Sequence, residues 1–566
     1  MRVRRRVRTF AALLGLASCL ALAAAHGPAS SAQRRAGGAA RAGAPGVYGV
    51  RAFGARGDGK TVDSAAVNRA IDAAAAAGGG TVHFPAGTYL CFSVRLKSNI
   101  TLHLDSGATI LAADPARDKG SYDQPEPNEW DMYQDFGHSH WQNSLIWGVG
   151  LENVSILGPG TIDGKGLTKR SPGPRRPANP GDTPVSMGGA NTGGKALAPL
   201  GEDADVRTMS GLGNKAISLK LSRNVTLRDL TIFRGGHFAV LATGVDNLTI
   251  DNLRVDTNRD GFDIDACRNV RVSNSTVNTP NDDAIVLKSS YALGAARATE
   301  NVTITNCQVT GYDEGTLLDG TFRKTQEFAP DRDRVTGRVK FGTESNGGFK
   351  NITISNVVFD HCRGLALETV DGGNIEDVVV TGVTMRDVTT APLFLRLGRR
   401  MRGPEGTPVG AIRRVRISNV VVSDADPRFA SIIAGLPGHP VEDVSLSDIR
   451  ILYKGGGTRE QAALEPPERE ANYPEPSMFG ELPAYGLFIR HARGVEVTNV
   501  SVGFAREDLR PAFHLEDVRG ATFLGVSAQK AADVPTFVLK NVEDFSVRNS
   551  RPVPDTRVER AESKRF

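Results

Sequence analysis

Short apolar segments recur along most of the chain in one pattern, Asn-apolar-x-apolar-x-Asn. The clearest copies begin at Asn247, Asn269, Asn301 and Asn351. Weaker copies begin at Asn224, Asp377, Arg414, Asp443, Gly494 and Asp544. Alternation with a period of two indicates β-strands, and spacings of 23 and 22 residues between the copies at 224, 247 and 269 indicate a repeating coil. The pattern predicts one parallel β-solenoid, because independent sandwich domains, the alternative, do not keep such a phase.

One segment departs from this pattern. Residues 65–77 are Ala-rich and end at Gly78-Gly79-Gly80, which predicts a helix, with Asp63 and Ser64 as candidate capping residues. A solenoid needs its ends covered, so we expect this helix to cap the first coil. We therefore predict a β-helix catalytic domain over residues 47–566, with the cap and first coils in 47–115.

The first 46 residues indicate export. Five arginines precede an apolar run over residues 10–25 with small residues at its end, which is typical of a secretory signal peptide in residues 1–25, cleaved near Ala23–Ala25. Residues 26–46 are rich in Ala, Gly, Ser, Pro and Arg and are expected to form a flexible linker. A lipobox around Cys19 and a twin-arginine signal at Arg5-Arg6 remain alternatives. We expect a secreted or periplasmic protein.

Composition and charge limit the possible classes of function. The formal charge of the 566 residues is +5, but eight arginines lie before residue 47 and no acid does, so residues 47–566 carry −3. That balance argues against a nucleic-acid partner. Apart from the leader, no segment is long and apolar enough to span a membrane. Four dispersed cysteines, Cys91, Cys267, Cys307 and Cys362, indicate neither a disulfide framework nor a metal site.

Acidic residues fall at one phase of the repeat. Counting thirteen residues from the first Asn of three consecutive copies reaches Asp260, Asp282 and Glu314, with Asp283 and Asp313 adjacent. Neighbouring coils lie about 4.8 Å apart, and carboxylates stacked at that spacing repel, so at least one is expected to hold a proton. Such a cluster indicates acid–base catalysis; a Ca²⁺ site or a solvated acidic edge is the alternative.

Two motifs around these acids resemble the polygalacturonases and their relatives, glycoside hydrolase family 28. Asn258-Arg259-Asp260-Gly261 stands where the family has Asn-Thr-Asp-Gly, and Asn281-Asp282-Asp283 stands where it has Gly-Asp-Asp. The resemblance runs from about residue 47 to at least residue 440. It implies an all-β, right-handed, single-stranded parallel β-helix of the pectin-lyase-like type. It also implies a monomeric enzyme that hydrolyses a pectic poly- or oligosaccharide without cofactor or metal.

The resemblance also implies an inverting mechanism. Asp282 is expected to protonate the departing glycosidic oxygen, and Asp260 and Asp283 are expected to activate water on the opposite face of the sugar. Inversion requires about 6.5–9.5 Å between acid and base, which diverging side chains on adjacent coils are expected to provide. The expected substrate-binding residues are Asn258, Lys288, Glu314, Glu368 and His237.

Two family motifs are missing. The family's Gly-His-Gly aligns with Asp313-Glu314-Gly315, and its Arg-Ile-Lys aligns with Ala366-Leu367-Glu368. In the family those cations bind a uronate carboxylate, so their loss favours a neutral sugar such as rhamnose or cations supplied by loops. The candidate loop cations are Arg323, Lys324, Arg338, Lys340, Arg396, Arg399 and Arg400.

Residues 128–147 contain all three tryptophans, Trp130, Trp141 and Trp147, together with His138 and His140. Clustered aromatics suit stacking on sugar faces, although a loop packed on its own aromatics has the same composition. Two other functions stay open. One is a β-helix lyase that uses Ca²⁺ and an Arg or Lys base, and the other is a non-catalytic carbohydrate-binding solenoid.

Overall fold

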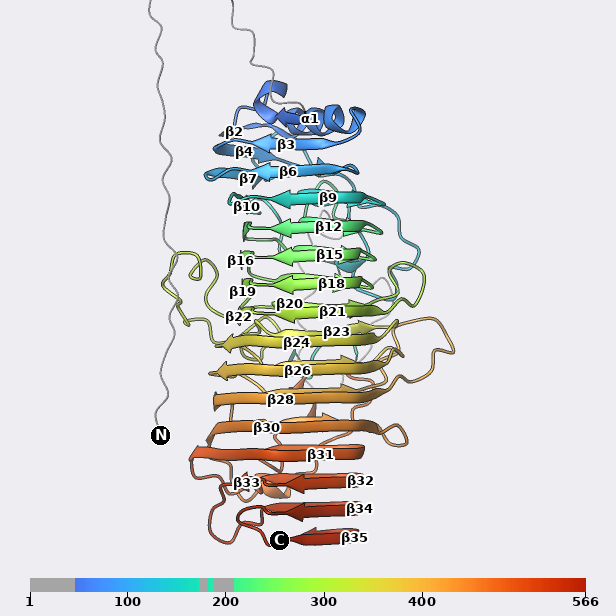
Figure 1. Ribbon diagram of the computed structural model, residues 1–566, viewed down its shortest axis with the longest axis vertical. Coiled ribbons are helices and arrows are strands. Elements are labelled where there is room, and N and C mark those ends of the chain that lie inside the picture. Colours follow the sequence, from blue (N-terminus) through green and yellow to red (C-terminus); the bar gives the residue numbers. More distant parts are fainter. Residues whose placement is uncertain (1–45, 173–180, 188–207) are drawn as a thin grey trace, which may run out of the picture. The chain divides into compact units, whose positions relative to one another are not determined.

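The computed structural model describes residues 46–172, 181–187 and 208–566, which all belong to one compact unit. Its strands pair in parallel from coil to coil, so that a single sheet winds into a helix with three faces (Figure 1). The predicted parallel β-solenoid is confirmed. The signal peptide, most of the linker and Cys19 lie outside the described residues. No helix in the described part of the chain is long and apolar enough to cross a membrane.

The first face carries the candidate site. Its strands are β5 (Val94–Arg95), β8 (Ile146–Val149), β11 (Lys215–Lys220), β14 (Phe238–Thr243), β17 (Asp260–Asp265), β20 (Ile285–Ser289), β23 (Val339–Ser345), β25 (Leu365–Thr369), β27 (Leu393–Leu397) and β29 (Ser431–Ala434). Each pairs in parallel with the next, for example Phe262 with Ile285 and Ile285 with Val339.

The Asn-apolar-x-apolar-x-Asn copies lie on the second face, and the second Asn of each copy lies at the turn toward the third face. The second face contains β1 (Val47–Gly49), β3 (Gly80–Phe84), β6 (Ile100–Leu104), β9 (Glu152–Leu157), β12 (Arg223–Arg228), β15 (Asp246–Asp251), β18 (Arg268–Ser273) and β21 (Thr299–Thr305). The third contains β2 (Asp58–Val62), β4 (Gly87–Cys91), β7 (Ala108–Ala112), β10 (Thr161–Asp163), β13 (Thr231–Phe233), β16 (Arg254–Asp256), β19 (Thr276–Asn278) and β22 (Gln308–Thr310).

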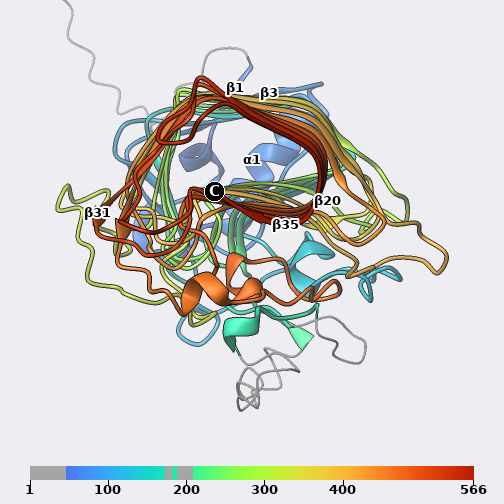
Figure 2. The same cartoon turned by 90° about the horizontal axis from the view of Figure 1, so that it is seen from below.

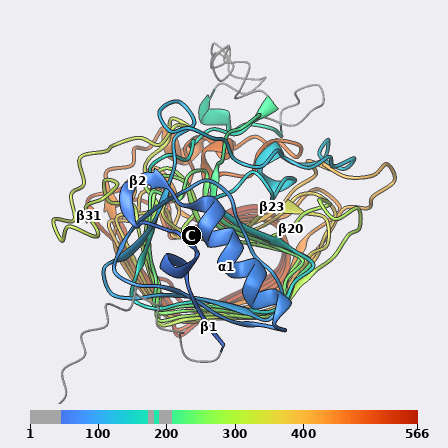
Figure 3. The same cartoon turned by 90° about the horizontal axis from the view of Figure 1, so that it is seen from above.

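Later coils merge these faces into long bent strands. These are β24 (Phe349–Asp360), β26 (Ile375–Arg386), β28 (Ile412–Ala425), β30 (Val441–Gly455), β31 (Leu487–Arg506), β32 (Phe513–Leu524), β34 (Phe537–Arg548) and β35 (Thr556–Arg565), whereas β33 (Ser527–Ala528) is a short strand that pairs with β31. β35 pairs with β34 in the antiparallel sense and covers the last coil (Figure 2). At the other end, α1 (Ser64–Ala76) covers the first coil, as predicted (Figure 3).

The 3-10 helices lie in connections. They are η1 (Val50–Phe53), η2 (Phe136–His138), η3 (Val185–Met187), η4 (Gln461–Ala463) and η5 (Pro476–Phe479). Asp63 is the N-cap residue of α1, as predicted, but its side chain makes no capping hydrogen bond. Its carboxylate accepts hydrogen bonds from the backbone N–H groups of Arg56 and Gly57, at 2.7 and 2.9 Å, and so fastens the preceding turn.

Asparagine ladders hold the turns in register. The first Asn of each copy has a positive φ, and its amide donates to the Asn of the preceding coil, as from Asn247 to Asn224 at 2.9 Å and from Asn269 to Asn247 at 3.2 Å. A second ladder runs through the other Asn, for example from Asn306 to Asn274 at 3.3 Å. Asparagine suits these positions because it tolerates the left-handed region and can bond at both ends. Between the turns, inward apolar side chains fill one continuous core.

Candidate active site

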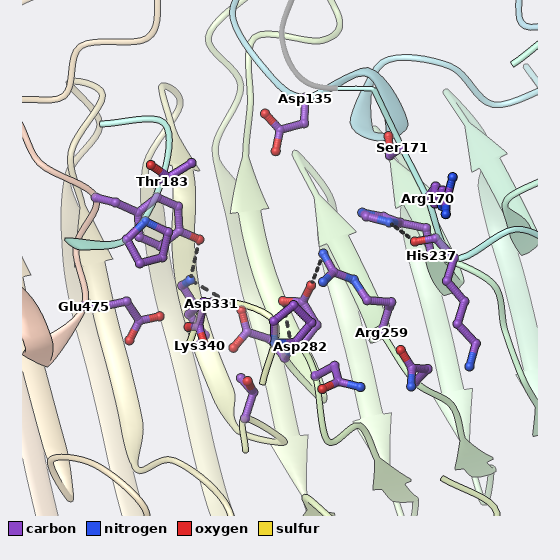
Figure 4. Close-up of a pocket in the computed structure, with 18 of the residues that line it drawn as sticks. Asp135, Arg170, Ser171, Thr183, His237, Arg259, Asp282, Asp331, Lys340 and Glu475 are labelled. Atoms are coloured by element: carbon purple, nitrogen blue, oxygen red, sulfur yellow. Dashed lines mark hydrogen bonds and ion pairs between the residues drawn. The ribbon is translucent and has the colours of Figure 1, made fainter. Parts of the chain in front are cut away.

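The candidate site lies on the first face, where β14, β17, β20 and β23 begin. Asp260 is the first residue of β17, Asp282 and Asp283 come just before β20, and Arg338 comes just before β23. Asp282, Asp283 and Arg338 line a cavity of about 510 Å³ (Figure 4), and Asp260 lines a smaller adjoining pocket of about 80 Å³ together with Asp282 and Asp283. Loops complete the wall of the larger cavity, contributing Asp135, Lys169, Arg170, Ser171, Pro172, Asp182, Thr183, Pro184, Pro330, Asp331, Thr336, Arg363, Tyr473 and Glu475.

Three carboxylates converge at the smaller adjoining pocket. Asp260, Asp282 and Asp283 each place one carboxylate oxygen within 4.8 Å of the other two. Strand pairing sets Asp260 beside Asp283, whose N–H group donates to Asp260 Oδ1 at 3.3 Å. The expectation that diverging side chains keep about 6.5–9.5 Å between acid and base is wrong for these oxygens, because the pairing brings them closer than that range.

The carboxylates differ in their electrostatic surroundings. Burial and the charge of Asp282 raise the pKa of Asp260 well above its ordinary value. Burial alone would also raise the pKa of Asp283, but the charges of Lys340 and Arg338 outweigh it and lower this pKa to about 2. Asp260 is therefore disposed to hold a proton, whereas Asp283 stays ionised.

A buried ion-pair cluster explains why Asp283 stays ionised. Arg338 Nε lies 2.8 Å from Asp283 Oδ1, and Lys340 Nζ lies 3.4 Å from Oδ2. Glu475 accepts from Arg338 at 3.1 Å and lies 3.2 Å from Arg363, so it holds the cluster from the opposite side. Arg338 and Lys340 thus lie at the carboxylates, on and beside β23, and not out on the loop before it.

Glu314 does not continue the stack of acids. The chain between β22 and β23 forms a loop. In the third coil, Gly337 takes the position in register with Asp283, and therefore with Asp260. From this loop Glu314 contacts Lys169 at 2.5 Å and Asn258 at 3.5 Å. The prediction that Glu314 stacks with the acids of the preceding coils, which came from counting thirteen residues from Asn301, is therefore wrong, because the repeat length changes there. Asn258 itself lines the cavity.

Lys288 is buried and already neutralised. Its Nζ lies 3.0 Å from Asp263 Oδ2 and 3.5 Å from Glu344 Oε2, and it also contacts His138 Nε2. Its charge reaches Asp260 and moderates the rise in the pKa of that carboxyl. Lys288 therefore lies beside the three carboxylates, and its ammonium group already contacts Asp263, Glu344 and His138.

His237 lines the cavity, and its Nδ1 lies 2.9 Å from the backbone oxygen of Lys169. Burial, followed by the charge of Arg259, lowers the pKa of His237 well below its ordinary value, so the ring is neutral. Because Nδ1–H donates to a carbonyl, Nε2 is left as an acceptor.

None of the tryptophans in residues 128–147 lines the cavity. Trp141 is buried and donates to Thr243 Oγ1 at 3.0 Å, and Trp147 donates to Asp123 at 2.9 Å. Trp130 meets Tyr291 edge to face. The tryptophans therefore form no stacking platform at this cavity, and they contact residues outside their own loop instead. His138 does lie near the site: its Nε2 is 3.2 Å from Asp263 Oδ2.

Glu368 lies behind the cavity wall. It has no exposed surface, and its Oε2 lies 3.6 Å from Lys340 Nζ. Burial raises the pKa of Glu368 to about 8, although Lys340 and Arg338 act in the opposite direction. The structure therefore places Glu368 against Lys340 and not against a bound sugar.

A Glu368→Gln variant is expected to unfold at a higher temperature than the native protein in mildly alkaline buffer and at a similar temperature near pH 5. The pKa of Glu368 rises from 4.5 to about 8 on folding, so the folded state holds this proton more tightly. That contribution to stability is complete below 4.5 and is lost as the pH rises through about 8. Thermal unfolding of both proteins across this range measures it. Parallel pH curves would contradict the assignment.

The sequence did not predict Arg259, Tyr473 or Glu475 as site residues. Arg259 stands where the family motif has Thr, and its Nη2 lies 2.8 Å from Asp282 Oδ2. Tyr473 and Glu475 come from a connection more than 180 residues after Asp283. For Arg259, the departure from the motif was the available signal. For Tyr473 and Glu475, only the length of the connection between β30 and β31 indicated a functional loop.

The donor groups favour protein cations over a metal ion. Three described clusters near the cavity bring donor atoms within 4.8 Å: Asp260 with Asp282 and Asp283, His138 with Asp260 and Asp263, and Asp135 with His138 and Glu344. Each cluster already contacts a cationic side chain: Arg259, Arg338 and Lys340 at the first, Lys288 at the second, and Arg402 and Lys288 at the third. A metal ion here would face these positive charges, which makes the donor set a poor fit.

Two family models match separate parts of the chain. One, described as rhamnogalacturonase A/epimerase, pectate lyase-like, matches residues 47–144, and one described as a right handed beta helix region matches residues 204–326. The exo-poly-alpha-D-galacturonosidase of Dickeya chrysanthemi is 26% identical over 376 residues, which cover 62% of this chain and 57% of that protein. This chain therefore matches little more than half of that relative's length.

Two further likenesses agree. The endo-polygalacturonase of Pectobacterium parmentieri is 25% identical over 329 residues, covering 55% of this chain and 74% of that protein. The solved structure of a family 28 exopolygalacturonase from Yersinia enterocolitica has a TM-score of 0.58 and 19% identity, covering 85% of this chain and 78% of that one. The latter bears on the fold alone. Fold, motifs and relatives together show a right-handed parallel β-helix protein that is similar to the polygalacturonases of glycoside hydrolase family 28.

Proposed function

We propose that the protein is a glycosidase that hydrolyses galacturonosyl bonds in a pectic poly- or oligosaccharide. The observation that carries this proposal is the convergence of Asp260, Asp282 and Asp283 on one cavity in unlike electrostatic surroundings. Carboxyl groups held in different protonation states at one site are what acid–base hydrolysis of a glycoside requires. The similarity to polygalacturonases points to the same substrate class.

In this proposal Asp282 is the general acid. Asp283, kept ionised by Arg338 and Lys340, takes the proton of the attacking water, and Asp260 helps to hold that water. The carboxylate spacing is shorter than inverting glycosidases commonly have, so the inverting outcome rests on the family resemblance. Proton NMR of the first product tests it: an inverted anomer is expected, and a retained anomer would contradict it.

The neutral-sugar alternative is not favoured. It rested on the loss of cations at the aligned motif, but Arg338, Lys340, Arg363 and Arg259 all line the cavity. Glu368, which stands at the aligned position, is buried against Lys340 and does not oppose a uronate directly. A substrate carboxylate therefore meets a wall that contains cations, which supports galacturonate over rhamnose.

Purified protein assayed on polygalacturonate, rhamnogalacturonan and their short oligomers tests the function. We expect new reducing ends from polygalacturonate and no rise in ultraviolet absorbance, with or without a calcium chelator. Cleavage with an absorbing, chelator-sensitive product would indicate a lyase. Binding of the polymer without any cleavage would indicate the non-catalytic solenoid.

We also propose export with removal of a leader. The support is the Arg-rich start, the apolar run and the small residues at Ala23 and Ala25. Mass spectrometry of the protein recovered outside the cytoplasm is expected to find a new N-terminus near residue 25. An intact Met1 would contradict this proposal, and a lipid on Cys19 would support the lipobox.

A further inference from the structure

Arg259 occupies a distinctive place in the cavity. It precedes Asp260 at the start of β17 and reaches across to the next coil, where its Nη2 lies 2.8 Å from Asp282 Oδ2 (Figure 4). The side chains of Arg259 and Asp282 are both 25% exposed, so a ligand in the cavity can reach the pair. Burial would lower the pKa of Arg259, but Asp282 and Asp260 raise it, so the guanidinium stays charged.

The other cations beneath the cavity are each held by two acids. The pairs are Arg338 with Asp283 and Glu475, Lys340 with Asp283 and Glu368, Arg363 with Asp331 and Glu475, and Lys288 with Asp263 and Glu344. All four side chains are at most 8% exposed. Removing such a cation from its partners strands a buried charge, which costs several kcal/mol. Arg259 has one close acidic partner in the described part of the chain and can exchange it at lower cost.

The cations at the rim are less suited to the task. Lys169 is 44% exposed and pairs with Glu314, and Arg170 is exposed. Contacts made by exposed charges are weakened by water and salt. A planar guanidinium inside the cavity can instead bind a carboxylate through two parallel hydrogen bonds.

We propose that Arg259 leaves Asp282 to bind the carboxylate of the uronate at the cleaved bond. Asp282 then takes up a proton and acts as the general acid. The inference rests on the proposed function. Once the substrate takes Arg259, Asp282 loses its counter-ion while the carboxyls of Asp260 and Asp283 remain beside it. A carboxylate that loses its cation next to other acids binds a proton more readily.

The proton balance of the cycle closes. Asp282 takes one proton from solvent when substrate binds and transfers it to the glycosidic oxygen as that bond breaks. The attacking water forms the new bond to the anomeric carbon and gives its proton to Asp283, which releases it to solvent. The charged groups that line the smaller pocket with Asp282 are Arg259, Asp260, Asp283, Lys340, Lys288, Asp135 and Glu344. His237 is neutral and adds no competing cation.

The alternative is a purely structural ion pair. In that case Arg259 holds Asp282 ionised throughout, the substrate carboxylate binds elsewhere, and no proton is taken up on binding. The two views therefore differ in a quantity that does not depend on turnover.

Calorimetric titration of the native protein with an S-linked trigalacturonate, which resists hydrolysis, tests the inference. Binding heats in buffers of different ionisation enthalpy give the number of protons taken up. We expect uptake approaching one proton per ligand. Arg259→Gln is expected to abolish the uptake and weaken binding by at least about tenfold, since a charge-assisted bond is lost.

Two variants serve as controls. Arg259→Lys keeps the charge but not the paired donors and is expected to fall between native and Arg259→Gln, which also guards against a folding defect. Arg271→Gln, at an exposed position of β18 on the second face, is expected to retain the uptake. No proton uptake, or equal affinity in native protein and Arg259→Gln, would overturn the inference. Cleavage of natural polygalacturonate by the native protein is measured alongside: its absence would count against the proposed function instead.

Discussion

An Asp282→Asn variant is expected to cleave polygalacturonate about 10²–10⁴-fold more slowly than the native protein while remaining folded. Asparagine keeps the shape of the side chain but cannot give a proton to the leaving oxygen, and general acid catalysis commonly contributes that factor. Asp282 is a quarter exposed and precedes β20, so its replacement should leave the coil intact. Initial rates of reducing-end formation, with thermal unfolding as a check, measure the effect.

Asp260→Asn and Asp283→Asn are expected to slow the reaction to a similar extent, because both are assigned to the attacking water. Asp533→Asn is a matched control: Asp533 is exposed, lies far along the chain and has a positive φ that asparagine tolerates. It should behave like the native protein. Near-native turnover in all three site variants would show that the chemistry takes place elsewhere.

A Lys340→Met variant is expected to be destabilised by about 3–5 kcal/mol and to lose most of its activity, because it removes one partner from a buried cluster of charges. Lys340 is 3% exposed and lies 3.4 Å from Asp283 and 3.6 Å from Glu368. Without it the pKa of Asp283 rises from about 2, so the proposed base becomes easier to protonate. Denaturant titration and initial rates measure the two effects.

Lys350→Met is the control for this change, since Lys350 is exposed on β24. A surface substitution of this kind should alter stability by no more than about 0.5 kcal/mol. Equal behaviour of the two variants would mean that Lys340 does not support Asp283.

The sequence predicted the fold because each coil repeats the same physical requirements. Inward β-branched residues alternate with polar ones, and Asn247, Asn269 and their counterparts occupy turns with positive φ. The acids on consecutive coils could be found for the same reason, since register carries Asp260 to Asp283. Glu314 was misplaced because a loop interrupts the repeat between β22 and β23, and counting along the chain does not survive a change of coil length.

The charged wall could not be obtained from the sequence. Arg338 precedes β23 and Lys340 lies near its start, but Arg338 pairs with Glu475 and Lys340 contacts Tyr473, and both of these partners come from a distant connection. Ion pairing across such a distance leaves no periodic signal. The pairing of Arg259 with Asp282 is similarly a contact between coils, visible in the sequence only as an arginine in place of the family's threonine.

Digestion of polygalacturonate in ¹⁸O-labelled water tests the central claim most directly, because hydrolysis and elimination differ in whether water enters the product. Mass spectrometry of the first products from the native protein is expected to find one ¹⁸O at each new reducing end, and the Asp282→Asn protein should yield almost none in the same time. Unlabelled, ultraviolet-absorbing products, or labelled products formed equally fast by both proteins, would contradict hydrolysis by this cluster of acids.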